Sequence, residues 1–171
     1  SLLFRIHFFA NETFLTIYSG LICLNLTESS NALHLAYAYA NICIITGSIG
    51  MHTQARKYAR KALNIAWQQG DLPTLVYALN VNGLYRIIIG DWRCARGALE
   101  QAVALAERLG DWSAWGANWI LLAQVAGYQG DFAQAREMFA QLSSEAKRYD
   151  NGIMLAWALA EGGKLLPEGG H

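Results

Sequence analysis

Four histidines are the residues of this 171-residue chain best suited to hold a metal ion or to exchange a proton near neutral pH. A zinc site needs ligands at short, fixed spacings, such as two histidines separated by three residues on one helix. The histidines stand far apart, and none has a second ligand at such a spacing: His7, His34, His52 and His171. We therefore expect exposed or helix-capping histidines, and predict no metal site and no cofactor.

The three cysteines could in principle form disulfides, bind metal or act as nucleophiles. Cys23, Cys43 and Cys94 are widely spaced and include no CxxC pair. An odd number without paired spacing argues against a disulfide framework and fits the reducing cytosol. We expect each cysteine to be a small buried hydrophobic residue, and the chain to be cytoplasmic.

Motifs for phosphate binding and nucleophilic catalysis are incomplete in this sequence. Gly162-Gly163-Lys164 lacks the upstream glycine of a phosphate-binding loop and the Ser or Thr that follows its lysine. It also follows a helical pattern instead of a strand, so we interpret it as the end of a helix. No Gly-x-Ser-x-Gly elbow occurs. The sequence thus predicts no catalytic residues, and we expect this chain not to be an enzyme.

The composition argues against two further classes of protein. Hydrophobic residues make up 54% and charged residues only 15% of the chain, with 13 basic and 13 acidic side chains. An average soluble domain carries about 25% charged residues. Disorder requires low hydrophobicity and high net charge. Affinity for nucleic acid requires an excess of Lys and Arg, so we expect no nucleic-acid partner.

One cluster of basic residues leaves two interpretations open. Its members lie four to five positions apart or less: Arg56, Lys57, Arg60 and Lys61. The cluster is either a solvated convex helix face or an ionic contact with a neighbouring domain or an acidic partner.

The dipeptide Gly-Asp recurs at intervals of 20 residues and indicates the architecture. It occurs at Gly70-Asp71, Gly90-Asp91, Gly110-Asp111 and Gly130-Asp131. Glycine adopts the left-handed conformation that ends a helix, and aspartate caps the first amides of the next helix. The spacing leaves about 16 residues, or roughly 24 Å of helix, between these turns. Apolar residues between them follow the helical period, so we expect no strands.

Helices two steps apart resemble each other, so the repeating unit is a helical pair of 40 residues. One helix class shares Tyr37-Ala38, Tyr77-Ala78 and Trp157-Ala158 in register, and the other shares Ala55, Ala95 and Ala135. We predict an all-α, right-handed α-solenoid of antiparallel helix pairs, with the first helix of each pair on the concave face. About eight helices are expected, at residues 3–27, 31–48, 53–69, 73–89, 92–109, 112–129, 132–148 and 152–165.

The ends of the chain differ from the repeats. Residues 1–29 are expected to be an amphipathic helix left from an upstream repeat, because Arg5, His7, Asn11 and Glu12 interrupt the apolar run that a membrane span would need. Its uncapped apolar face suggests a homodimer through this helix. Residues 30–166 are the repeats, and residues 167–171 form a flexible tail.

These residues resemble tetratricopeptide repeats over about residues 31–165. GDFAQAREMFAQL is similar to that family's turn and second helix, with Ala135 and Phe139 at its small and aromatic positions. Ala95, Ala102 and Gly83 match further small positions, and Trp119 and Leu122 match large apolar ones. The period of 40 is longer than the family's 34, the inter-repeat proline is absent, and Cys43 replaces a smaller residue. These departures concern the curvature of the solenoid.

A narrower resemblance is to the C-terminal helical repeats of large bacterial signalling proteins, carried by segments such as AYAYANIC, NGLYRIIIGDW and AWALAEGGKLLPEG. In those proteins a nucleotide cyclase or kinase domain is joined to an AAA-type ATPase module. This resemblance implies that catalysis belongs to other domains of the parent protein, which could be a cyclase or a kinase.

The concave face is the binding surface that the resemblance implies. By repeat register it includes Tyr37, Ile44, Tyr77, Asn80, Leu84, Ile88, Gln124 and Tyr128. Tyrosines and amides suit an extended or helical peptide, although the same residues could instead pack within the solenoid.

We therefore expect a non-catalytic interaction scaffold that regulates a larger signalling protein. Its partner would be a protein, a peptide or another domain of its own chain. The alternative is a small-molecule-sensing regulatory domain of a signalling or transcription-regulating ATPase.

Overall fold

The computed structural model describes residues 13–27 and 31–163. These residues form α-helices and include no β-strand, which confirms the predicted all-α class. Between residues 31 and 148 every predicted helix boundary lies within one residue of the observed one. The helices are α2 (Thr13–Thr27), α3 (Ala32–Ser48), α4 (His52–Gln69), α5 (Leu72–Ile88), α6 (Trp92–Leu109), α7 (Trp112–Tyr128), α8 (Phe132–Arg148) and α9 (Gly152–Gly163).

The recurring Gly-Asp pairs separate the helices as predicted. Each glycine has a positive φ, from 64° at Gly70 to 85° at Gly130, which non-glycine residues rarely adopt. Each aspartate then accepts a backbone N–H three residues on, as Asp111 does from Ala114 at 2.9 Å. The same reading explains the last turn, where Asp150 takes the positive φ and the residue after it caps α9.

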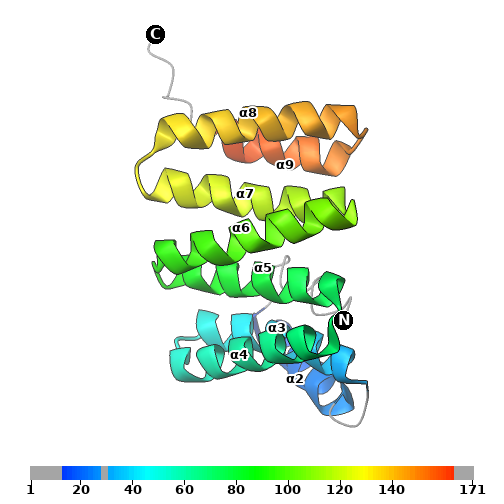
Figure 1. Cartoon of the computed structure of the whole chain (residues 1–171). Coiled ribbons are helices and arrows are strands. Elements are labelled where there is room, and N and C mark those ends of the chain that lie inside the picture. Colours follow the sequence, from blue (N-terminus) through cyan, green and yellow to red (C-terminus); the bar gives the residue numbers. More distant parts are fainter. Residues whose placement is uncertain (1–12, 28–30, 164–171) are drawn as a thin grey trace.

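The helices are stacked in chain order, from α2 at one end to α8 and α9 at the other (Figure 1). Successive helices pack against each other, and α3, α5, α7 and α9 also contact one another in sequence. We call these four the odd layer. Within the described ranges no comparably close contact joins α4 to α6 or α6 to α8, which we call the even layer. The right-handed superhelical sense stays a prediction.

Small residues allow the close approach of the two helices in each pair. The predicted alanine positions are buried throughout the repeats: Ala55, Ala66, Ala95, Ala106, Ala135 and Ala146. Gly83 of α5 lies against the buried Leu99 of α6, so close that a Cβ at Gly83 would come within 2.6 Å of the Leu99 Cγ and Cδ2 atoms. The core therefore depends on volume at fixed positions of the repeat.

Several expectations about the chain ends and cysteines have mixed outcomes. Cys43 is buried as predicted, but Cys94 is exposed, so the expectation that it is buried is wrong. Residues 1–12, 28–30 and 164–171 lie outside the described residues, and with them much of the predicted first helix and the whole predicted tail. On α2, Tyr18 and Leu26 are among several exposed apolar residues; a homodimer through this helix stays a prediction. No helix within the described ranges has the length and apolarity to cross a bilayer.

Candidate functional site

The eight residues predicted to bind a partner all lie in the odd layer, on α3, α5 and α7. They do not form one accessible surface. Ile44 is only 4% exposed and packs in the core between α3 and its neighbours, so it cannot contact a partner in this conformation. Ile88 and Tyr128 are exposed, while the other five are half-buried: Tyr37, Tyr77, Asn80, Leu84 and Gln124.

The polar members of this set bind to the next helix of the odd layer. The Tyr77 hydroxyl donates to Asn41 Oδ1 and so joins α5 to α3. The Asn80 amide donates to Oδ1 of the buried Asn118 at 3.0 Å and so joins α5 to α7. Gln124 Nε2 donates to a Glu161 carboxylate oxygen at 3.1 Å and so joins α7 to α9. These hydrogen bonds tie the odd layer together, since buried polar groups need partners within the fold.

Two ring contacts involve the same face. Tyr37 packs on Tyr77 with centroids 4.7 Å apart, and Tyr128 stacks on Trp92 with centroids 5.4 Å apart. Packing within the chain, which was one of the two sequence interpretations, therefore accounts for most of these residues. Partner binding at this face stays a prediction.

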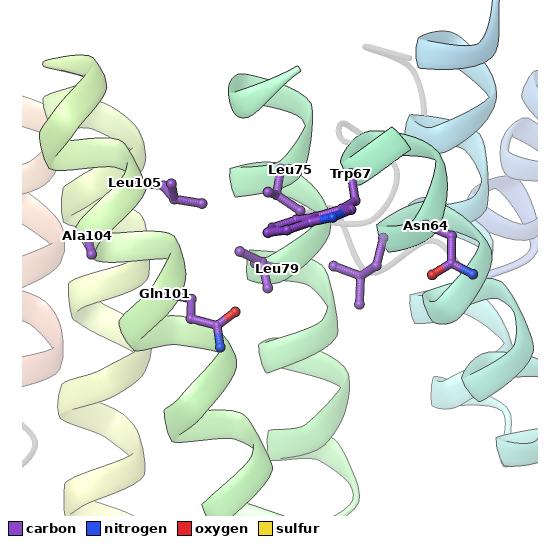
Figure 2. A pocket seen from close by; sticks show the side chains of 8 residues that line it. Asn64, Trp67, Leu75, Leu79, Gln101, Ala104 and Leu105 are labelled. Atoms are coloured by element: carbon purple, nitrogen blue, oxygen red, sulfur yellow. The ribbon is translucent and has the colours of Figure 1, made fainter. Parts of the chain in front are cut away.

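The even layer contains an open groove that the sequence interpretation missed. It lies between α4 and α6, its floor is α5, and its volume is about 590 Å³. We call it the α4–α6 groove. Figure 2 shows side chains of the two flanking helices directed toward the same space. Most of the lining is apolar, and the full set is Leu63, Asn64, Trp67, Leu75, Leu79, Gln101, Ala104 and Leu105.

Trp67 is the most unusual residue of this groove. Its indole extends from α4 toward Leu75 and Leu79 on the floor (Figure 2), yet the residue remains 74% exposed. Positions 40 and 80 residues later carry the charged Glu107 and Lys147. A large aromatic residue therefore occupies a repeat position that is otherwise polar, and this is the sequence signal that could have located the groove.

The corresponding region one repeat later is closed, and we call it the α6–α8 seam. In register with Leu75 and Leu79 stand two tryptophans, Trp115 and Trp119, whose rings stack with centroids 5.0 Å apart. Trp115 is 5% exposed, and the Trp119 indole N–H donates to the Met138 carbonyl of α8 at 3.0 Å. The larger side chains thus occupy the space that the two leucines leave open.

The preceding repeat is also filled by aromatic side chains. Tyr39 stands in register with Leu79, and its ring stacks on Tyr58 with centroids 5.6 Å apart. The Lys61 ammonium lies 4.7 Å from the centre of the Tyr39 ring. Among these three repeats, the groove therefore coincides with the one that has leucine at both floor positions.

The basic cluster of α4 is divided between two sides of that helix. Arg56 and Arg60 precede the groove-lining residues of α4 by one and two turns on the same flank, because residues three and four apart share a face. Lys57 and Lys61 lie further round, where Lys61 contacts Tyr39. Helix α4 contains no Asp or Glu. The groove flank of α4 is therefore purely basic.

The facing flank of α6 is also free of acidic residues. Arg108 follows the groove-lining Leu105 by three positions and is exposed. The other flank of α6 carries Arg96, which donates to Gln129 at the end of α7. The acidic residues of α6 fall by helical register on this second flank: Glu100 and Glu107.

Two titratable groups have shifted pKa values. Burial raises the pKa of the Cys43 thiol to about 12, so this thiol stays protonated and unreactive near neutral pH. Burial also opposes ionisation of Asp91, but hydrogen bonds from Cys94 and the Arg86 guanidinium 2.8 Å away outweigh it and hold the Asp91 pKa below its usual value. Both groups belong to the framework of the repeats.

Across residues 13–27 and 31–163, no three His, Cys, Asp or Glu side chains are placed together to hold a metal ion. No protein-family model matches the chain, and a search of curated proteins finds no match. The resemblances to tetratricopeptide repeats and to bacterial signalling proteins therefore stay predictions.

Proposed function

We propose that this chain is a non-catalytic protein-binding module and that the α4–α6 groove is its docking surface. The observation that carries the proposal is the contrast between this open groove and the closed α6–α8 seam. A repeat that needed only to stack could have filled the position with tryptophans, as the next repeat does. Instead, two leucines leave about 590 Å³ accessible, and an exposed tryptophan stands at its edge.

The shape and chemistry of the groove suit a segment of another protein. It lies between two helices that run in the same direction, and grooves of this kind accept an amphipathic helix. Exposed aromatic residues next to apolar depressions are typical of the residues that dominate binding energy in protein interfaces. Trp67, Leu75 and Leu79 provide both elements.

Selection of binding peptides tests this proposal. A displayed library of random peptides about 16 residues long, enough for four helical turns, would be panned on the purified chain. Counter-selection would use the L75W/L79W variant, which reproduces the side chains of the closed seam. We expect peptides that bind the wild-type chain and not this variant. Enrichment of no such peptides, with the variant folded by circular dichroism, would contradict the proposal.

One observation favours a second candidate, the small-molecule-sensing domain. The groove volume of about 590 Å³ lies within the range of small-ligand pockets, about 300–1,000 Å³. A ligand that binds only the folded state raises its stability. A thermal-shift screen of metabolites would therefore identify such a ligand, and the L75W/L79W variant would have to lose the shift. The narrower resemblance supports the interdomain form of the first proposal, in which the docked segment belongs to the parent signalling protein.

A further inference from the structure

Resting on the proposed docking function, we infer the chemistry of the partner: an acidic amphipathic helix that places bulky apolar side chains at positions i and i+4. The inference comes from the spacing of the groove floor and from the charge on its two flanks. It specifies both faces of the docked segment.

The floor of the groove sets the apolar spacing. Leu75 and Leu79 are four residues apart on α5, so their side chains follow one another along one face of that helix. Leu63 and Leu105 line the two sides. A helix lying along the groove meets this floor with residues that are themselves three or four apart, because the same periodicity governs both helices. Leu or Phe at i and i+4 would occupy the space that Trp115 and Trp119 fill one repeat later.

The flanks of the groove set the charge. Arg56 and Arg60 continue the groove side of α4, Arg108 continues that of α6, and all three are exposed. No acidic residue stands on either facing flank. The aspartate nearest in sequence to the end of α4, Asp71, is engaged as the cap of α5, where it accepts the Thr74 N–H at 2.9 Å. Complementarity therefore favours a segment with Asp and Glu beside its apolar stripe.

The charge also separates this partner from other ligands. Apolar contact alone would accept a basic helix as well as an acidic one, whereas three arginines with no acidic neighbour repel a basic segment. Arginines beside an exposed tryptophan could alternatively bind single-stranded nucleic acid through phosphates and base stacking. The balanced net charge of the chain argues against this ligand, and the experiment includes it as a contradicting outcome.

Fluorescence anisotropy with a designed peptide tests the inference. The probe is a fluorescein-labelled helical peptide of about 16 residues with Leu and Phe at i and i+4 and Glu on its flanks. Its matched control carries Lys in place of every Glu. We expect the acidic peptide to bind at least about tenfold more tightly than the basic one, a difference of 1.4 kcal/mol. This preference should weaken as salt is added, because exposed charges are screened.

Variants of the chain locate the binding site. L75W/L79W should weaken binding of the acidic peptide about tenfold or more by filling the floor. Arg56→Glu with Arg60→Glu should weaken it to a similar extent. Lys57→Glu with Lys61→Glu makes the same change in net charge on the other flank of α4 and should change affinity less than about threefold. Trp67→Ala, at an exposed position, gives a second groove variant whose folding is not at risk.

Each remaining outcome overturns the inference. Equal affinity for the acidic and basic peptides, an equal effect of the two charge-reversal pairs, or tighter binding of an oligothymidine probe would each contradict it. These failures differ from failure of the proposed function. If panning yields groove-dependent peptides without acidic residues, the docking function stands and only the partner chemistry is wrong.

Discussion

The α4–α6 groove and the α6–α8 seam are the same place in two consecutive repeats. Both lie between two helices of the even layer, with a helix of the odd layer as the floor. They differ mainly at two floor positions, Leu75 and Leu79 in one and Trp115 and Trp119 in the other. The comparison shows that the repeating backbone supplies the location of a groove, whereas side-chain volume decides whether that groove is open.

Substitution of one tryptophan from each region should give the largest difference in stability. Trp115 is 5% exposed and Trp67 is 74% exposed. Trp115→Ala leaves a cavity in the closed seam and should lower the free energy of unfolding by about 3–5 kcal/mol. Trp67→Ala should change it by less than about 0.5 kcal/mol, as surface substitutions usually do. Urea denaturation of both variants measures this, and equal losses would show that Trp67 also belongs to the core.

Two glycines next to the groove provide a second contrast. Gly83 is covered by Leu99, whereas a Cβ at Gly97 of α6 would meet no atom within 4 Å. Gly83→Ala should destabilise the chain by about 1–3 kcal/mol through overpacking. Gly97→Ala should stabilise it by up to about 1 kcal/mol, because alanine favours the helix. Melting temperatures of the two variants should therefore move in opposite directions; a shift in the same direction would mean that α5 and α6 can separate.

The smallest effect is expected at the cap of α6, the helix that the two regions share. The Asp91 pKa is lower in the folded chain than in the unfolded chain, so its ionised form stabilises the fold. This contribution is complete above the ordinary carboxyl pKa of about 4 and is lost as the pH falls through the lower folded value. Asp91→Asn should cost less than about 1 kcal/mol at pH 7. The difference from wild type should vanish in strong acid, and a constant difference would exclude the Arg86 pair as its cause.

The sequence was most informative about the helices and least informative about surfaces. The Gly-Asp pairs place each helix end within one residue between 31 and 148, because left-handed glycine and capping aspartate act locally. Residues of the odd layer were recognised from register, but Ile44 proved to be buried and Tyr77, Asn80 and Gln124 proved to bind their neighbouring helices. Cys94 was expected in the core and is exposed.

The groove required the tertiary structure. Its lining comes from α4, α5 and α6, and an empty volume between helices depends on the distances among them, which no single helical pattern contains. The sequence by itself determined that the chain is all-α, where its helices begin and end, and which positions recur every 40 residues. Only the packing of those helices decided that leucines at two recurring positions leave space while tryptophans close it, because cavities arise from the combined volumes of side chains brought together from separate elements.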